Sequence, residues 1–541
     1  MEMPLFEARP YIRICAVPGI QYDTRWSEIQ PGLPRFLQSG SPSHFKLING
    51  WLRLCDQGKC GKRGGCCPKP HGALPTRVID VGKNKIGNDI VRLISTNKIS
   101  LISKIQGIHY VALSHCWGEP AKGQIPSWCT TRSNETERVM SGFPVKQLPA
   151  TFQDAIRVTR EIGKRYLWID SLCIIQGEGG DWGTEAKKME TVFKNAYCTI
   201  AATSAEDSTK GFLNRPVEES NLQYVTVPNS SHGKVYVCTS IDDFPGDVDE
   251  GVLNKRAWVL QERALSRRTI HFTKRQTYWE CGGGVRCETL TYMRNEKSSL
   301  RSDPEFPRSI EKRFPTAKIK LFQSLFAEYS NFGLTNKTDR PIAIDSLVRE
   351  LAKVFRTNVR YGIFECYLHR SLVWRRSENI LMAQIPYTAG HAVPSWSWMA
   401  YDGQIDYSEI QDVEWDKSVQ FVEDKASNAA SNPENDGYVL EARVKRFQDC
   451  EIKPEGLEHV ICDKEGYEVV HLWFDQDREA SIEIRCAIMG RKWEPEDGKR
   501  KYYVLVVTEG PERGSWVRVG MGSIEQRFIL FDGQDAAAWI I

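Results

Sequence analysis

The chain has no long apolar run. No stretch within its 541 residues approaches the roughly 18 uninterrupted apolar residues of a membrane-spanning helix. Its first residues, MEMPLFEARPYIRICAVPG, have neither the positive start nor the apolar stretch of a secretory signal. We therefore expect a protein with no membrane span and a cytoplasmic location.

The chain also has little net charge. Its 72 Lys and Arg residues against 69 Asp and Glu residues leave a formal charge of +3, too small to indicate a nucleic-acid or membrane surface. We expect no nucleic-acid partner. Hydrophobic residues at 41% and charged residues at 26% are typical of globular proteins, and the length predicts two or three domains.

A clear set of paired cysteine hooks, as in structural zinc sites, is lacking among the 16 cysteines. The densest group is Cys55, Cys60, Cys66 and Cys67 in CDQGKCGKRGGCC, at spacings of five, six and one, with His71 the nearest histidine. This spacing favours thiols without a metal, so we expect no metal site, and zinc at this group stays the alternative. Cysteines in apolar runs such as YLWIDSLCII are typical of buried thiols in a reducing compartment.

The pattern along the chain predicts four segments. Residues 1–75 are rich in Pro and Gly and are expected to be irregular. Residues 76–290 alternate strand-like runs (TRVIDVG, HYVALSH, YLWIDSLCII, CTIAAT) with helical stretches (LPATFQDAIRVTREIG, DWGTEAKKMETVFKNA). This alternation favours an α/β core, a parallel sheet with flanking helices.

The first helical stretch carries the clearest pattern. Its apolar stripe is followed by Gly163, which suits the C-terminal cap, and consists of Phe152, Ala155, Ile156, Thr159 and Ile162. Further along, RAWVLQERALSRR indicates a short helix, and TIHF with TYWEC a hairpin that turns at residues 273–275.

The rest of the chain has a different sequence pattern. Residues 291–425 form a helical segment, with KIKLFQSLFAEYS and IDSLVRELAKVF as its clearest stretches, and the segment contains the PSWSW element. In that element, core packing of Trp396 and Trp398 is the expected role. NAASNPENDG resembles a linker, and residues 437–541 hold short strand-like runs that predict a β-rich C-terminal domain.

Three blocks resemble a known family. YVALSHCWGEP at 110–120, YLWIDSLCIIQ at 166–176 and RAWVLQERALSRR at 256–268 resemble, in that order, the blocks of the fungal heterokaryon incompatibility (HET) domain. The resemblance assigns residues 76–290 to such a domain. It implies self/non-self recognition and programmed cell death signalling after hyphal fusion, with other incompatibility proteins or copies of itself as partners.

HET domains have been proposed as distant relatives of TIR domains, some of which hydrolyse NAD. The resemblance thus implies a TIR-like or flavodoxin-like sheet, no bound cofactor, and NAD as the substrate of a TIR-like reaction. Cleaving nicotinamide from ribose passes through an oxocarbenium-like state, so the reaction needs a carboxylate in a water-poor pocket. Fold analogy alone does not establish that activity.

Two carboxylates are the catalytic candidates. Ligands of open α/β sheets bind beyond the carboxyl ends of the strands, and Asp170 leaves its strand there. Glu185 lies on the core-facing stripe of the next helix, where a buried carboxylate is costly. Its alternative role is to complement the helix dipole, a contribution of about 0.3–1 kcal/mol.

The end of the HYVALSH run supplies the candidate nucleotide-binding residues Ser114, His115, Trp117 and Gly118. Trp117 offers a stacking face, and Gly118 allows close approach of backbone to a ligand. A tryptophan here is also a packing anchor in many proteins. The loop GEGGD lacks the spacing of a phosphate-binding P-loop.

Glu262 and Cys173 have alternative roles. Glu262 with Arg256 and Arg263 is expected to form an ion-pair network that locks its helix to the sheet, rather than to act in catalysis. For Cys173 with His115, a buried structural thiol is favoured over a nucleophile.

The alternative to an enzyme is a non-enzymatic interaction module whose apolar, Trp-rich surfaces recruit other death effectors. An enzyme needs a polar pocket around the strand ends, whereas an adaptor tolerates side chains that fill this region.

Overall fold

The structure is a computed structural model that describes residues 12–16, 32, 37–60, 73–82, 89–97, 108–118, 124–215, 224–229, 233–239, 242–293, 308–377, 381–388, 392–423, 438–455, 458–476, 483–493, 500–531 and 537–541. The chain forms two compact units, Met1–Phe306 and Pro307–Ile541. The finer division into four segments stays a prediction.

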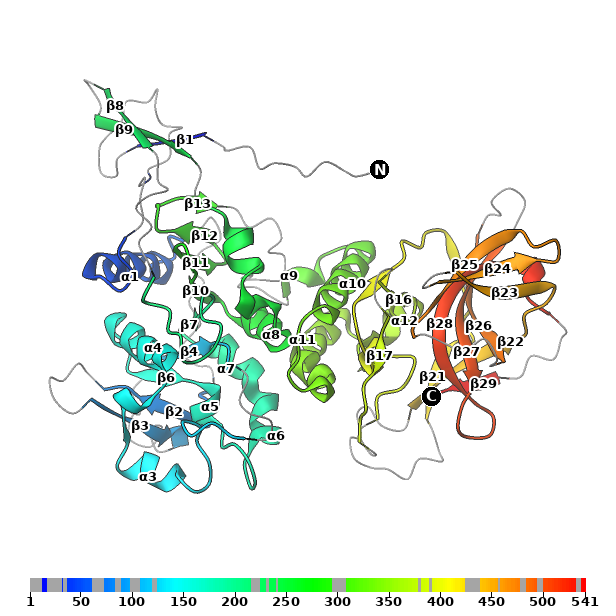
Figure 1. Cartoon of the computed structure of the whole chain (residues 1–541), viewed down its shortest axis with the longest axis horizontal. Coiled ribbons are helices and arrows are strands. Elements are labelled where there is room, and N and C mark those ends of the chain that lie inside the picture. Colours follow the sequence, from blue (N-terminus) through cyan, green and yellow to red (C-terminus); the bar gives the residue numbers. More distant parts are fainter. Residues whose placement is uncertain are drawn as a thin grey trace. The chain divides into compact units, whose positions relative to one another are not determined.

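A ten-stranded mixed sheet organises the first unit (Figure 1). Its centre is parallel, in the spatial order β6 (Tyr166–Trp168), β4 (Tyr110–Ser114), β7 (Cys198–Ala201) and β10 (Arg268–Phe272). Every residue of β4 is buried, as expected for a central strand covered on both faces. The α/β prediction is therefore confirmed for the core of the sheet.

Both edges of this sheet are antiparallel, so the prediction of a parallel sheet is wrong there. The TRVIDVG run forms β2 and pairs antiparallel with β6. Its apolar pattern indicates a strand but carries no information on strand direction. The antiparallel strands that flank the parallel centre are β2 (Arg77–Asp80), β3 (Ile90–Ser95), β5 (Phe143–Pro144), β11 (Thr277–Cys281), β12 (Gly284–Cys287) and β13 (Tyr292–Met293).

The predicted helix before β6 is confirmed as α4 (Ala150–Glu161). Its stripe is buried as expected, comprising Phe152, Ala155, Ile156, Thr159 and Ile162. Gly163 follows with φ of 72°, a left-handed conformation that favours glycine at a helix end. The hairpin of β10 and β11 is confirmed as well.

Two predicted elements are shorter than their sequence patterns suggest. The strand in YLWIDSLCII ends at Trp168, and a helical turn, α5 (Asp170–Cys173), follows. The amide of Ser171 donates to Asp170 Oδ1, and a carboxylate at this position suits the positive end of a helical turn. The helix in DWGTEAKKMETVFKNA is divided into α6 (Trp182–Glu185), a 3-10 turn (Ala186–Lys188) and α7 (Met189–Asn195).

The expectation of an irregular N-terminal segment is wrong for α1 (Pro42–Asp56). Ser41 caps this helix by accepting from the amide of His44, and Pro42 occupies its first turn. The buried face is Phe45, Ile48, Trp51, Leu52 and Cys55. These signals lie within a segment whose overall composition is that of a loop. Further out, β1 (Ile12–Ala16) joins β9 (Gly233–Thr239) and β8 (Tyr224–Asn229) in a separate small sheet.

A buried ion-pair network anchors α8 (Ala257–Leu265). The Arg263 guanidinium contacts Glu280 of β11 at 3.1 and 3.2 Å, and it contacts Asp249 at 2.6 Å. His271 of β10 bonds the same Glu280 carboxylate at 2.9 Å. Burial opposes ionisation, yet Arg263 and His271 hold the pKa of Glu280 well below its usual range. The network expected from the sequence, Glu262 with Arg256 and Arg263, is therefore wrong, because Arg263 pairs with Glu280 and Asp249 instead.

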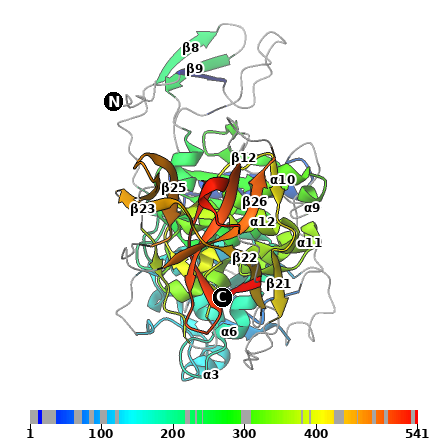
Figure 2. The ribbon, with the colours of Figure 1, turned by 90° about the vertical axis from the view of Figure 1, so that its right-hand side faces the viewer.

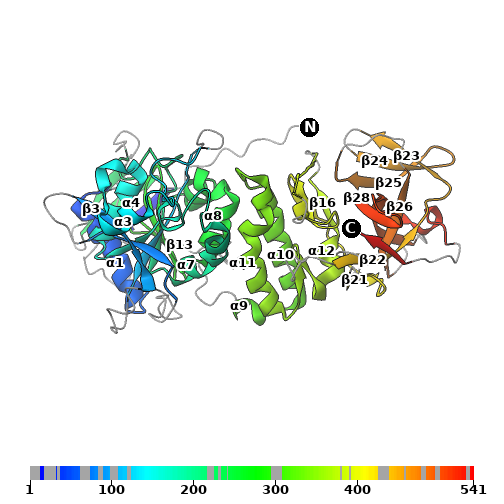
Figure 3. The ribbon, with the colours of Figure 1, turned by 90° about the horizontal axis from the view of Figure 1, so that it is seen from below.

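Helices and strands both contribute to the second unit. Helices α10 (Pro315–Ser330) and α11 (Arg340–Phe355) lie side by side in Figures 1 and 3, with the Phe322 and Phe355 rings 6.4 Å apart. Both confirm the helical stretches expected there. Neither these nor any other helix in the described part of the chain has the length and apolar character needed to cross a membrane.

The β-rich C-terminal region is confirmed (Figure 2). Five of its strands pair in a closed ring: β22 (Tyr438–Lys445), β26 (Ile484–Lys492), β27 (Lys501–Glu509), β28 (Ser515–Glu525) and β29 (Ala537–Ile540). The expected linker, NAASNPENDG, lies outside the described residues.

Core packing of the PSWSW element is confirmed, because Trp396 and Trp398 are 1% and 0% exposed. The Trp396 ring packs on Phe421, and the Trp398 ring packs on Phe326 of α10.

Removing the Arg263 side chain tests the anchor of α8. In Arg263→Ala, the buried Glu280 carboxylate loses its guanidinium, which costs about 3–5 kcal/mol for a buried pair. We expect this loss in the opening free energy of the β10 and β11 amides, measured by hydrogen exchange. Arg132→Ala is the control, because Arg132 forms an exposed pair with Glu135 worth about 0.2–1 kcal/mol. Equal losses in the two variants would contradict the anchoring role.

Candidate functional site

The carboxyl ends of β4 and β6 bring several of the expected site residues together. Trp117, three residues beyond β4, donates from Nε1 to Asp170 Oδ2 at 2.7 Å. Nδ1 of His115 lies 3.9 Å from the other Asp170 oxygen. Ser114 is the last residue of β4. Asp170 therefore links the two loops, and its side chain keeps 25% of its surface exposed.

His115 is a buried, neutral imidazole in this site. Its pKa is lowered to about 4, chiefly by burial; Asp170 opposes this change and Arg256 adds to it. The ring packs edge-on against Phe152 of α4, with centroids 5.0 Å apart. Because a neutral imidazole has one donor and one acceptor nitrogen, His115 offers a hydrogen-bonding group without a charge.

Glu262 of α8 is the second carboxyl group of the site. Burial raises its pKa to about 7; the neighbouring Ser114 hydroxyl and Arg256 oppose this rise, and the nearby Asp170 adds to it. Glu262 is only 8% exposed. A carboxyl with this pKa is present in both protonation states at neutral pH, the condition that suits proton transfer.

Four buried polar atoms of this region lack a hydrogen-bond partner among the residues the structure describes: Ser114 Oγ, His115 Nε2, Ser171 Oγ and Glu262 Oε2. Ser114 lies close enough to Glu262 to influence its pKa, but the geometry is not that of a hydrogen bond. Buried polar atoms are usually bonded, and each unsatisfied one costs about 1–3 kcal/mol. Ser114 and Glu262 adjoin each other, so their unbonded atoms together are suited to a polar ligand.

Glu185 lies in a different environment. Its Oε1 accepts from Thr76 Oγ1 at 2.8 Å and from Lys188 Nζ at 2.7 Å. Thr76 directly precedes β2, so these bonds connect α6 to the start of that strand. Glu185 is buried as expected, and its carboxylate is engaged in an ion pair with a clear structural role.

Gly118 is required by the packing of two loops. Its φ is 88°, and a Cβ there would lie 2.8 Å from the Cβ of Asp207, in the loop after β7. Ser208 of the same loop donates to the Cys116 carbonyl at 3.1 Å. Contact of Gly118 with a ligand therefore stays a prediction, whereas its contact with the neighbouring loop is a feature of the fold.

The cysteines near the strand ends are buried thiols. Burial raises the pKa of Cys173 to about 12 and also raises that of Cys116. Both therefore stay protonated at neutral pH, which argues against a Cys–His nucleophile. This agrees with the structural role expected for Cys173.

Sequence reasoning missed Ser171 and the surroundings of Glu262. Ser171 adjoins Asp170, so its position beyond a strand end was a usable signal. Glu262 was expected to pair with Arg256 and Arg263, but Arg256 donates to the His115 carbonyl at 2.9 Å and Arg263 bonds Glu280. Those partners are distant in the sequence, and no local pattern distinguishes them.

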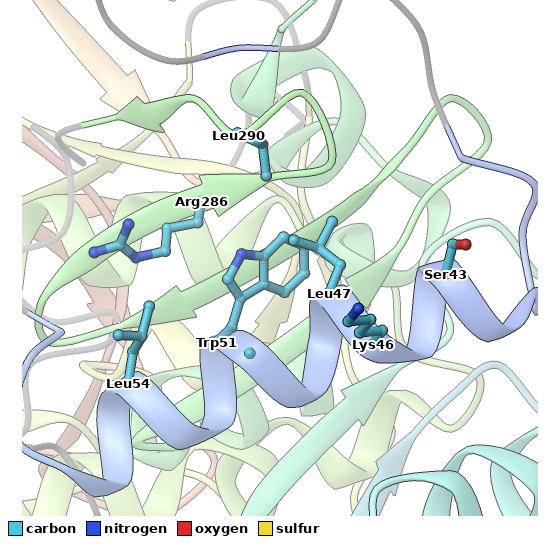
Figure 4. A pocket seen from close by; sticks show the side chains of 8 residues that line it. Ser43, Lys46, Leu47, Trp51, Leu54, Arg286 and Leu290 are labelled. Carbon is cyan, nitrogen blue, oxygen red and sulfur yellow. The ribbon is translucent and has the colours of Figure 1, made fainter. Parts of the chain in front are cut away.

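A separate groove of about 440 Å³ lies beside α1 (Figure 4). Residues of α1 line one side of the groove, and Arg286 of β12 and Leu290 line the other. The residues from α1 are Ser43, Lys46, Leu47, Gly50, Trp51 and Leu54. None of these lining residues is acidic. The groove therefore lacks the carboxylates that the chemistry considered above requires, and the strand ends remain the candidate site.

Comparison with known proteins gives one match, in the central part of the first unit. A family model described as "Heterokaryon incompatibility protein (HET)" matches residues 110–262. The match begins with β4 and ends at Glu262, so it spans the residues of the candidate site. No curated protein and no solved structure matches the chain.

The raised pKa of Glu262 predicts a pH-dependent stability. The folded protein binds this proton more tightly than the unfolded chain, whose carboxyl has a pKa near 4.5. The proton's stabilising contribution is full below that value and is lost as pH rises through about 7. At pH 8 the ionised Glu262 lowers the free energy of unfolding by at most about 3 kcal/mol.

Glu262→Gln removes this titration. We expect the variant to match the wild type in melting temperature at pH 4 and to exceed it at pH 8. Glu178 lies in an exposed loop. The difference in melting temperature between Glu178→Gln and the wild type should therefore not change with pH over this range. A difference that does not depend on pH would rule out titration of Glu262 as its cause.

Proposed function

We propose that residues 110–262, which match the HET family model, act in heterokaryon incompatibility and make the chain a trigger of programmed cell death in mixed cells. We further propose that the strand ends of this domain bind a nucleotide and cleave its N-glycosidic bond, with NAD as the substrate. Other incompatibility proteins or further copies of this chain are the expected partners.

The observation that carries the enzymatic proposal is the buried Glu262 carboxyl near Asp170 and the unbonded hydroxyl of Ser114; the unbonded hydroxyl of Ser171 adjoins Asp170 in the chain. When the bond between C1′ and nicotinamide breaks, the pyridinium nitrogen takes the electron pair and nicotinamide leaves uncharged. An ionised Glu262 would stabilise the positive charge on the sugar and accept the proton of the attacking water. The two serine hydroxyls suit the ribose hydroxyls.

The order of the parallel strands supports this location. Taken in chain order, β4, β6, β7 and β10 have the spatial order 2-1-3-4, the arrangement of flavodoxin-like sheets. In such sheets, ligands bind where the chain's path reverses direction between the first and third strands. Here those are β4 and β7, whose following loops contact each other through Gly118 and Ser208.

Nicotinamide release from NAD by the full-length protein tests the proposed reaction. We expect Glu262→Gln and Asp170→Asn to lower kcat/KM by roughly 100-fold or more, as loss of a catalytic proton-transfer group does. The wild-type rate should rise as pH rises through about 7, because the ionised carboxylate is the active form. Glu178→Gln serves as the exposed control.

Glu185→Gln separates the two candidate carboxylates. If Glu185→Gln lost nicotinamide release while Glu262→Gln kept it, the catalytic role would belong to Glu185. Absence of nicotinamide release from folded wild-type protein would contradict the proposed reaction.

Cell death is measured separately. Induced expression of the wild-type chain in a fungal host should reduce the number of viable cells, and Glu262→Gln at equal protein level should abolish this effect. Survival of cells that express folded wild-type protein together with its partners would contradict the proposed biological role.

A non-enzymatic adaptor is the second candidate, and Trp182 favours it. This residue is 36% exposed and packs edge-on against Trp258 of α8, with ring centroids 6.1 Å apart. Exposed tryptophans are enriched among the residues that dominate protein interfaces. Death that persists in Glu262→Gln but disappears in Trp182→Ala would select the adaptor.

A further inference from the structure

Three cysteines that are far apart in the sequence meet in the first unit. The sulfur atoms of Cys55, Cys60 and Cys281 all lie within 4.8 Å of one another, and all three residues are buried. Cys55 is in the last turn of α1, Cys60 follows that helix, and Cys281 ends β11. We propose that this cluster is a structural zinc site.

The geometry fits a zinc ion. Zinc binds thiolates at about 2.3 Å in tetrahedral sites, which places neighbouring sulfurs about 3.8 Å apart. The observed limit of 4.8 Å reaches that value with small side-chain rotations. Four residues separate Cys55 from Cys60, a spacing within the C-x2–4-C range of zinc hooks. Cys55 and Cys60 therefore have the spacing of a zinc hook.

The backbone around the cluster holds the three sulfurs together. After α1 the chain turns through Gly58, whose φ is 70°, and the Lys59 amide donates to the Leu54 carbonyl at 2.8 Å. On the other side, the Gly283 amide donates to Cys281 Sγ at 3.4 Å. An amide donor near sulfur favours the thiolate, the form that binds metal.

Gly283 also permits the close approach of the two segments. A Cβ at this position would lie 2.1 Å from the Cys60 carbonyl oxygen, so only glycine allows the β11–β12 turn to contact Cys60. The cluster thus lies where the end of α1 meets the hairpin of β11 and β12. A bound ion would join the N-terminal helix to the sheet edge with bonds stronger than packing alone.

The donor set selects the class of metal. Three thiolates favour zinc and other soft or borderline ions over magnesium or calcium, which take oxygen ligands. Three sulfurs fill three positions of a tetrahedral ion, and the described residues define no fourth ligand. Cys66 and Cys67 lie outside the described residues.

Metal analysis of the full-length protein, purified under reducing conditions from zinc-supplemented cells, tests the proposal. We expect about one zinc per chain in the wild type and less than about a tenth of that in Cys281→Ser. Cys462→Ser, a buried cysteine of the second unit, is the matched control and should retain the metal. Zinc-free wild-type protein, or retention of zinc by Cys281→Ser, would overturn the assignment.

Cobalt substitution tests the site in the wild-type protein, so the result does not depend on whether a cysteine variant folds. Wild-type protein exchanged with Co²⁺ should show a thiolate-to-cobalt charge-transfer band and the strong visible absorption of a tetrahedral ion. Weak absorption typical of octahedral cobalt, without the charge-transfer band, would exclude a thiolate site.

Discussion

The buried contact between Arg263 and Glu280 determines how the candidate site is built. Consecutive residues of a helix point about 100° apart, so fixing Arg263 on one side of α8 fixes the direction of Glu262 on another. Glu280 belongs to β11 and also bonds His271 of β10, so the helix is tied to two strands at once. Because a buried charge without a partner is costly, α8 cannot rotate or move away without losing this network. Glu262 is thereby held beside the end of β4.

The site itself is unfavourable for stability, and the fold compensates elsewhere. Glu262 carries a raised pKa, and several buried polar atoms around it lack partners in the described part of the chain. In the same unit, Arg263 satisfies Glu280, and Glu185 is satisfied by Thr76 and Lys188. This contrast between satisfied and unsatisfied carboxyl groups supports the choice of Glu262 for the candidate site, because natural folds tolerate such defects mainly where function requires them.

Local patterns were sufficient for much of the fold. The stripe of α4, the buried run of β4 and the hairpin of β10 and β11 follow from short stretches of sequence, and the structure confirms them. Features that depend on distant partners were not accessible in this way. The antiparallel pairing of β2, the choice of Arg263 for Glu280, and the approach of Cys281 to Cys55 each join segments that are remote in the chain. No periodicity within one segment encodes such a choice.

A crystal structure of the full-length chain with ADP-ribose, the product of NAD hydrolysis, tests the central claim most directly. The account predicts that the ligand binds at the ends of β4 and β6, with ribose hydroxyls bonded to Ser114 or Ser171 and the anomeric carbon near Glu262. A structure in which ADP-ribose at saturating concentration binds elsewhere, or does not bind, while Glu262 and Ser114 bond each other, would contradict it.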